Sequence, residues 1–533
     1  MKNRSLLARG SGALPLPSPS FKTPLAQDPQ QAAAALASAA SSAPRSQLGL
    51  PVLCGLLLAL CTLGLTSCHP ASYYYYKFPS STYAGRPVPP SKLAERVMIG
   101  YTFNGSSGAL AIVDALRDIR SNVEDTIPNF SIKGYSSGYP GTILSFPAEL
   151  RGYVYSNSDG SLVNINYSTE ASAGSVGSFQ SGTSAVAVPP TFGHFYGAEE
   201  AAGVLEVIDN LNGGSYALTI PNVFKVVVNA GDTVALAMVR NANTVYRVFK
   251  LNEGQFANNQ LAIAATGSVD CQPYLFPVYC AVAVPGTYDQ PSGVYFSLDG
   301  TTAYVLNCGP ECGGEVASVT LLQQGPLNEN VIPSSPIQPN PQTANVPVPG
   351  GVTEALSDGT TLYLAGQQLQ PDGLFAGFLS TMSQATNTIT GKYSISDGSH
   401  SKLLFADNNT LWVGSQYCAT GERAKLGENY NCLTMVTLGA TSGTIASVQI
   451  VPNVTPGGAV VVPYPNQNDD QYYYGSLTGI CWVQNYNKVY TAYGGQVHIF
   501  STVDGSEIDN EYVTVQGTAL DVAYMDALSD GAN

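Results

Sequence analysis

The stretch VYFSLDGTTAYVLN (Val294–Asn307) places two short runs of β-branched, aromatic and aliphatic residues on either side of an Asp-Gly turn. Asp-Gly suits a tight hairpin, because glycine accepts a positive φ angle and the aspartate side chain hydrogen-bonds back to the turn backbone. The same arrangement returns as VTEALSDGTTLYL (Val352–Leu364). Both stretches therefore predict the first two strands of a recurring antiparallel unit.

Weaker copies of this hairpin occur along the chain, and further short strands follow each of them. The copies are Ile143–Tyr155, Ala185–Tyr196, Val223–Val239, Leu403–Val413 and Ile480–Tyr493. No long amphipathic helix pattern interrupts them between residues 96 and 526. A period of roughly 40–60 residues with four strands per unit is typical of a β-propeller.

The stretches Asp299–Asn307 and Asp358–Leu364 resemble the YVTN-repeat β-propellers, a family that also includes lactonase-like propellers. The resemblance covers most of residues 96–526 in pattern, although only these two units match in letters. It implies an all-β propeller. Because propellers host many unrelated activities, it implies little about function.

The two ends of this region predict how the ring closes. Leu520–Met525 has the pattern of a first strand without a successor, whereas Val97–Phe103, Ala109–Val113 and Phe130–Tyr135 have the pattern of second, third and fourth strands without a predecessor. Pairing them gives one shared blade and removes free sheet edges. We therefore predict eight four-stranded blades over 96–526, with seven blades as the alternative, followed by a short tail at 527–533.

The segment Leu65-Thr66-Ser67-Cys68 closes the uncharged run Leu48–Leu65. It resembles the lipobox of a bacterial lipoprotein signal peptide. The resemblance implies a signal peptide at 1–67 with a long, basic n-region, cleavage before Cys68, and a diacylglycerol and fatty acid such as palmitate on the mature cysteine. An uncleaved signal anchor and a fortuitous cysteine are the alternatives.

Residues 68–95 are rich in tyrosine and proline, and they predict a flexible tether between the lipidated cysteine and the propeller. His69 follows Cys68 directly, which by the same resemblance favours the outer membrane. We expect an outer-membrane lipoprotein facing the periplasm or the cell surface.

The formal net charge of the chain is −15, and only 11% of its residues are charged. An ordinary domain carries about 25% charged residues. An acidic surface repels phosphate backbones, so nucleic-acid binding is disfavoured.

Cysteine spacing in an oxidising compartment predicts three local disulfides. Cys308 and Cys312 flank Gly-Pro-Glu in a turn between strands, Cys418 and Cys432 border a loop, and Cys271 and Cys280 border a third. Cys481 is left over in an apolar strand, which predicts a buried free thiol. No cysteine has the histidine neighbours of a metal finger.

Candidate catalytic residues are few. His194, His400 and His498 fall on different units, and His194 and His400 are the ones placed to reach a central channel. Glu199-Glu200 lies in a Gly/Ala-rich turn, which predicts a solvated loop rather than an acid–base pair. The loop Pro452–Tyr474 contains Asp469 and Asp470 but lacks the regular ligand spacing of a calcium loop. No motif of a nucleophile, phosphate loop, metalloprotease or haem site occurs, and we predict no metal and no cofactor.

These patterns favour a lipid-anchored envelope propeller that acts as a non-catalytic binding or scaffold module. Its expected partners are the membrane, through the lipid, and an unidentified protein, glycan or small molecule. One alternative is a lactonase- or lyase-like enzyme with its site at the channel. Another is a structural component of the surface layer.

Overall fold

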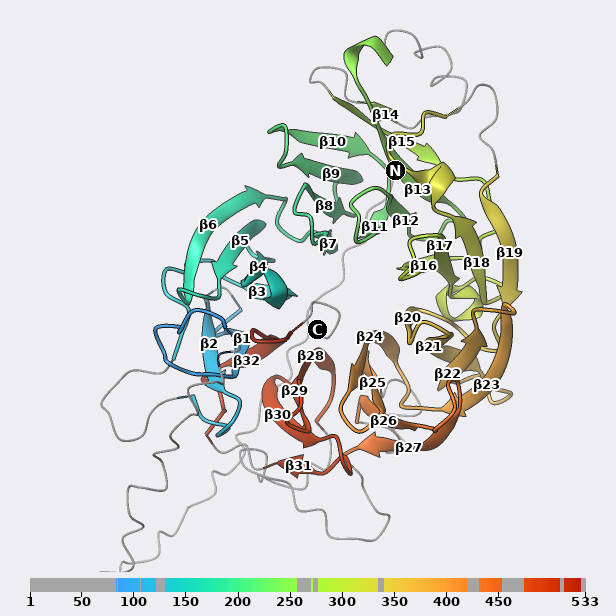
Figure 1. The fold of residues 1–533 in the computed structure, drawn as a ribbon. Helices are drawn as coiled ribbons and strands as arrows, with labels where there is room; N and C mark the ends of the chain where they lie inside the picture. The colour runs from blue at the N-terminus through green and yellow to red at the C-terminus, as the bar shows by residue number, and fades with distance from the viewer. Residues whose placement is uncertain are drawn as a thin grey trace, which may run out of the picture. The chain divides into compact units, whose positions relative to one another are not determined.

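Antiparallel sheets arranged in a ring dominate the computed structural model of the chain (Figure 1). The structure describes residues 83 and 85–528, except for 106, 121–129, 256–269, 272–276, 334–339, 419–430, 453–473 and 509–511. The ring lies within the compact unit Phe78–Asn533.

Within the described residues, the ring has eight sheets, which we number as blades 1 to 8 in ring order. Their strands, from the centre outward, are β32 (Thr518–Tyr524), β1 (Arg96–Thr102) and β2 (Gly108–Asp114) in blade 1; β3 (Pro140–Phe146), β4 (Arg151–Ser156), β5 (Ser161–Asn166) and β6 (Ala171–Ser178) in blade 2; β7 (Ala185–Ala187), β8 (His194–Glu199), β9 (Val204–Asp209) and β10 (Ser215–Thr219) in blade 3; β11 (Val223–Val228), β12 (Ala235–Val239), β13 (Val245–Leu251), β15 (Val278–Ala283) and β14 (Asp270–Cys271) in blade 4; β16 (Pro291–Phe296), β17 (Thr302–Asn307), β18 (Ser318–Gln323) and β19 (Gln342–Pro347) in blade 5; β20 (Glu354–Ser357), β21 (Thr361–Leu369), β22 (Phe375–Ser383) and β23 (Thr388–Ser394) in blade 6; β24 (Ser399–Ala406), β25 (Thr410–Gln416), β26 (Leu433–Leu438) and β27 (Ile445–Val451) in blade 7; β28 (Leu477–Val483), β29 (Lys488–Tyr493), β30 (Gln496–Ser501) and β31 (Glu507–Ile508) in blade 8.

Short 3₁₀ turns follow some of these strands. They are η2 (Pro147–Glu149), η3 (Gly309–Cys312) and η4 (Gly325–Leu327). The prediction of an eight-bladed propeller is confirmed, and the seven-bladed alternative is wrong.

Blade 1 is built from both ends of the propeller sequence, as predicted. Strand β1 pairs antiparallel with β2 on one side and with β32 on the other, where Val97 lies opposite Tyr524. The expected fourth strand at Phe130–Tyr135 is reduced to two isolated bridges, one between Ser131 and Ala111 within the blade and one between Lys133 and Ala171 of blade 2. Blade 4, in contrast, has one strand more than predicted, because β14 adds a fifth strand.

The hydrophobic core is divided among the seams between neighbouring blades. At the seam of blades 8 and 1, for example, Val97 and Ile99 pack against Cys481 and Tyr490, and all four are almost fully buried. Each of the other seams between successive blades has its own apolar cluster. A single blade would leave both faces of its sheet exposed, so the stability of each blade depends on its neighbours.

A charged cluster, which we call the latch, locks the closing blade. Its members are Arg86, Glu95, Arg96, Glu170, Tyr524 and Asp526. The Arg96 guanidinium donates Nε to Asp526 Oδ2 at 3.0 Å and Nη2 to Asp526 Oδ1 at 2.7 Å, and its Nη1 reaches Glu170 Oε1 at 3.0 Å. Arg96 and Asp526 are almost completely buried, so this bidentate pair joins the two ends of the propeller away from water.

Arg86 also belongs to the latch, although it lies in the segment expected to form the end of a flexible tether. Its Nη1 donates to Asp526 Oδ1 at 2.6 Å, and Leu93, Ala94 and Glu95 are buried against the propeller. Residues 85–95 are therefore fixed to the ring. The rest of the expected tether, up to residue 82, lies outside the described residues.

The Asp-Gly turns have the geometry that their sequence predicts. Gly300 and Gly359 adopt φ angles of 71° and 93°, in the region that only glycine occupies readily. Asp299 Oδ1 accepts the backbone N–H of Thr301 at 3.0 Å, and Asp358 Oδ1 accepts that of Thr360 at 2.8 Å. The side-chain acceptor and the glycine together fix the hairpin that repeats around the ring.

Candidate functional site in the central channel

The inner strands of the blades surround the centre of the ring (Figure 1). Most of them contain a β-bulge near the start of the strand. Among the described strands, one extra residue is inserted in β3, β11, β16, β24, β28 and β32. Strands β7 and β20 have a related irregularity just before they begin. Ser184 donates its backbone N–H to the carbonyl of Ala198, which is the residue paired with Ala185, and Thr353 donates to the carbonyl of Ala365, which is the residue paired with Glu354. The residues that follow these positions thus occupy one level of the ring.

We call these residues the girdle. In ring order from blade 1 to blade 8, they are Asp521, Thr142, Ala185, Lys225, Gly293, Glu354, Lys402 and Gly479. A glycine thus stands between a lysine and a carboxylate twice in the girdle, first in blade 5 and again in blade 8.

Each glycine leaves room for an ion pair that spans its blade. Lys225 Nζ lies 3.6 Å from Glu354 Oε2, across blade 5. A Cβ atom on Gly293 would lie 3.1 Å from Lys225 Nζ. A second lysine–carboxylate pair crosses blade 8 in the same way, past the glycine of that blade.

In that second pair, Lys402 Nζ lies 3.9 Å from Asp521 Oδ1. A Cβ atom on Gly479 would lie only 2.3 Å from the same carboxylate oxygen. Asp521 is 3% exposed, whereas the side chain of Lys402 is 33% exposed.

The Asp521 carboxylate is already occupied by backbone donors. Oδ2 accepts the N–H of Ile143 at 2.8 Å, and Oδ1 accepts the N–H of Val522 at 3.0 Å. Burial raises the pKa of Asp521, and the nearby Lys402 ammonium and these two N–H groups oppose that shift. Asp521 therefore ties β32 to β3 and has little capacity left for another partner.

A cavity of about 630 Å³ opens at this level of the channel. Its polar lining includes Glu354, Ser401, Lys402 and Asp521. Its apolar lining comes mainly from Ile143, Leu144, Phe146, Leu403, Leu404, Ile480, Val522 and Ala523. The cavity thus combines a charged edge with an apolar wall, which is the usual composition of a small-molecule site.

The histidines proposed as candidates do not meet in this cavity. His194 begins β8 and is buried in the seam between blades 3 and 4, where its Nδ1 lies 2.8 Å from Asp232 Oδ2 and its Nε2 lies 2.7 Å from the Tyr279 hydroxyl. Burial lowers the pKa of His194, but the hydrogen bond and charge of Asp232 outweigh it and raise the pKa overall.

His400 is close to the channel in sequence, since it precedes Ser401 on β24. Its ring is nevertheless buried, and Nε2 lies 2.8 Å from the carbonyl of Ser396. Burial lowers the pKa of His400 to about 4. His498, on β30, stacks on Tyr474 with ring centroids 4.2 Å apart, and its Nδ1 lies 2.6 Å from Glu507 Oε1.

The prediction for Glu199-Glu200 is half wrong. Glu200 lies at the surface and pairs with Arg240. Glu199 ends β8 and is only 3% exposed, with Oε1 accepting the N–H of Gln180 at 2.9 Å. Burial and the neighbouring Glu206 raise the pKa of Glu199 to about 7. The turn begins one residue later than expected, so it solvates only the second carboxylate.

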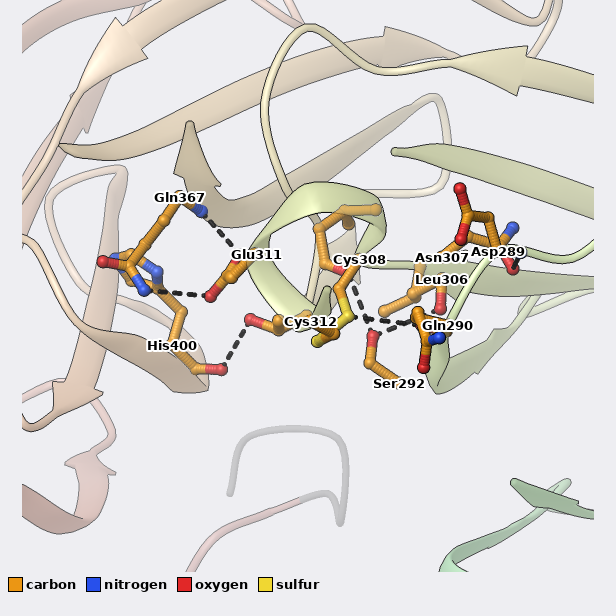
Figure 2. The surroundings of a disulfide bond; sticks show 12 residues. Asp289, Gln290, Ser292, Leu306, Asn307, Cys308, Glu311, Cys312, Gln367 and His400 are labelled. Atoms are coloured by element: carbon orange, nitrogen blue, oxygen red, sulfur yellow. Dashed lines mark hydrogen bonds between the residues drawn. A yellow bond between two sulfur atoms is a disulfide. The ribbon is translucent and has the colours of Figure 1, made fainter. Parts of the chain in front are cut away.

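The three disulfides pair as the sequence predicts: Cys271 with Cys280, Cys308 with Cys312, and Cys418 with Cys432. Cys481 is a buried free cysteine. Figure 2 shows the Cys308–Cys312 bridge on η3, with Glu311 directed toward Gln367 of blade 6. Glu311 Oε2 accepts the backbone N–H of Gln367 at 2.8 Å, so the bridged turn also links two blades.

Several predictions concern residues outside the described part of the chain. They are the signal peptide 1–67, Cys68, the loop at 453–473 and the tail from 529 onward. Among the described residues, no helix is long and apolar enough to cross a bilayer. The same residues contain no group of three or more metal-ligating His, Cys, Asp or Glu side chains.

The fold and the channel define the class of protein: an eight-bladed β-propeller. No protein-family model and no curated protein matches the chain. Solved structures with a similar arrangement include the dihydro-heme d1 dehydrogenase NirN (11% identity, 83% of this chain and 79% of that chain, TM-score 0.48).

Two further similar structures are apo AztD from Citrobacter koseri (10% identity, 81% and 97%, TM-score 0.43) and a putative 6-phosphogluconolactonase from Bacteroides uniformis (12% identity, 81% and 99%, TM-score 0.41). At these identities the likeness concerns the fold alone. The names of these three proteins indicate no shared activity.

Proposed function

We propose that the protein is a lipid-anchored β-propeller of the bacterial outer membrane that acts as a non-catalytic binding module. Cys68 is the anchor, and the channel of the ring is the binding surface. The three disulfides support an oxidising compartment outside the cytoplasm.

The observation that carries the binding role is the girdle. Lys225 and Lys402 present ammonium groups that lie 3.6 and 3.9 Å from their carboxylates, beyond hydrogen-bonding distance. Their N–H donors are therefore available to an incoming acceptor. The three described histidines, in contrast, are held by neighbours in the blades and seams.

The anchor is tested by metabolic labelling with a clickable fatty-acid analogue in a bacterial host that processes lipoproteins. The native chain should incorporate the label, and Cys68→Ala should lose it. Cys54→Ala is the matched control, because it changes a cysteine of the proposed signal peptide and should leave labelling intact. Equal labelling of the native chain and Cys68→Ala would contradict the proposal.

A further inference from the structure

The girdle offers recognition groups of both signs on neighbouring strands. Strand β20 carries Glu354, and the adjacent inner strand β24 carries Ser401 and Lys402. The Thr353 hydroxyl donates to the carbonyl of His400 at 2.9 Å, which holds the two strands together beside these side chains. All three groups line the same cavity.

The hydrogen-bonding capacity of these groups is largely unused. Among the described residues, Lys402 has only the Asp521 carboxylate nearby, at 3.9 Å, and Glu354 has only Lys225, at 3.6 Å. The Ser401 hydroxyl is buried and has no partner within the described part of the chain. A buried polar group without a partner carries a desolvation cost, which a ligand can relieve by hydrogen bonding.

Two carboxylates line the cavity, those of Glu354 and Asp521, and only one of them is open to a ligand. Both oxygens of Asp521 accept backbone N–H groups, and this residue is almost completely buried. The Glu354 side chain is 28% exposed and accepts no such bond. The exposed groups are thus one carboxylate and one ammonium, with the buried, unpartnered Ser401 hydroxyl beside them, next to an apolar wall formed by residues such as Leu404 and Ile480.

We infer that the channel binds a small zwitterion with an apolar body, of the class of apolar α-amino acids. The ligand ammonium is bound by Glu354, and its carboxylate is bound by Lys402 and Ser401. Its apolar side chain lies against Leu144, Phe146, Leu404 and Ile480. A ligand without net charge also avoids the repulsion that a chain of net charge −15 exerts on anions.

This inference rests on the proposed binding role, and its test begins with the full chain purified in detergent. Isothermal titration calorimetry would compare L-leucine with two analogues of similar shape, 4-methylpentanoate, which lacks the ammonium, and 3-methylbutylamine, which lacks the carboxylate. Leucine should bind, and each analogue should bind about ten- to a hundredfold more weakly, because each loses a hydrogen bond to a charged group. Equal binding of leucine and either analogue overturns the inference.

Two substitutions test the partners separately. Lys402→Met should weaken leucine binding by about tenfold or more while leaving the amine unaffected, and Glu354→Gln should weaken leucine while leaving the carboxylate analogue unaffected. Lys250→Met is the matched control, because Lys250 pairs with Glu329 outside the cavity lining. The analogue series needs no substitution, so it tests the inference even where a variant fails to fold.

Failure of the ligand class is distinguishable from failure of the proposed anchor. If neither leucine nor phenylalanine binds at about 10 mM while Cys68-dependent lipid labelling is retained, the zwitterion site is wrong and the anchor stands. If leucine binds but labelling is lost equally with and without Cys68, the anchor is wrong and the site stands.

Discussion

The latch and the girdle use the same chemistry, a basic side chain facing a carboxylate, yet they differ in how completely it is used. In the latch, Arg96 meets Asp526 through two bonds of 2.7 and 3.0 Å, and both groups are buried. In the girdle, Lys402 stays 3.9 Å from Asp521, and a third of its side chain is exposed. A saturated pair fixes structure, whereas an unsaturated pair at a cavity leaves donors for a ligand.

The largest expected effect is on the latch. Arg96→Met removes the guanidinium that the buried carboxylates of Asp526 and Glu170 share, and it should lower the free energy of unfolding by about 3–5 kcal/mol. Urea denaturation followed by tyrosine and tryptophan fluorescence measures it. A loss below about 1 kcal/mol would mean that Arg86 alone compensates Asp526, and the contrast between the two regions would weaken.

The latch should also respond to pH through Glu95, which accepts the Tyr524 hydroxyl. Burial raises the pKa of Glu95 to about 7, so the folded protein holds a proton there that the unfolded chain releases near pH 4.5. Stability from this group is present at low pH and is lost as pH rises toward 7.

Glu95→Gln should therefore stabilise the protein by about 2–3 kcal/mol at pH 8 and change it little at pH 4.5. The measurement is the difference in unfolding free energy between variant and native chain across this range, since other buried carboxyls affect both equally. A difference that does not grow with pH would contradict the raised pKa of Glu95.

The two girdle glycines should differ from each other. Gly479→Ala places a Cβ 2.3 Å from Asp521 Oδ1 and 2.7 Å from the Val522 nitrogen, so backbone must move, and we expect a loss of about 1–3 kcal/mol. Gly293→Ala meets the flexible end of Lys225 at 3.1 Å and should cost about 0.5 kcal/mol or less. Thermal unfolding of both variants checks the order, and equal losses would argue against a tighter fit in blade 8.

The effect of Lys402→Met on stability should also be small. The pair with Asp521 is long and partly exposed, so its removal should change the unfolding free energy by about 1 kcal/mol or less. Urea denaturation beside Arg96→Met gives the comparison directly. A loss as large as that of Arg96→Met would assign the girdle to structure and not to recognition.

The ring was predictable from local sequence because each hairpin is specified locally. Asp299-Gly300 and Asp358-Gly359 fix tight turns, and Leu520–Met525 lacks a partner until Val97–Phe103 supplies one. The extra strand β14 and the loss of a full fourth strand in blade 1 were not predictable, because pairings of only one or two residues leave no alternating pattern in the sequence.

The girdle could not be read from the sequence. Its charged members come from blades far apart along the chain, and most inner strands have a bulge that shifts the alternation of their side chains by one residue. The orientation of the His194 side chain was equally unpredictable from the sequence, because its partner Asp232 lies in the turn between β11 and β12 of the next blade. A signal does exist in retrospect: Lys, Gly and an acidic residue recur at one level of three successive blades, and they do so twice.

The place of Asp521 links closure of the ring to completion of the channel. It lies on β32, the last strand of the propeller to be synthesised, and it gives Lys402 its carboxylate neighbour while holding the N–H of Ile143. A ring that has not yet received β32 is both open along β1 and incomplete at its channel. Ligand competence would then appear only with the final strand, so that a truncated or partly assembled molecule exposes an edge but offers no finished site.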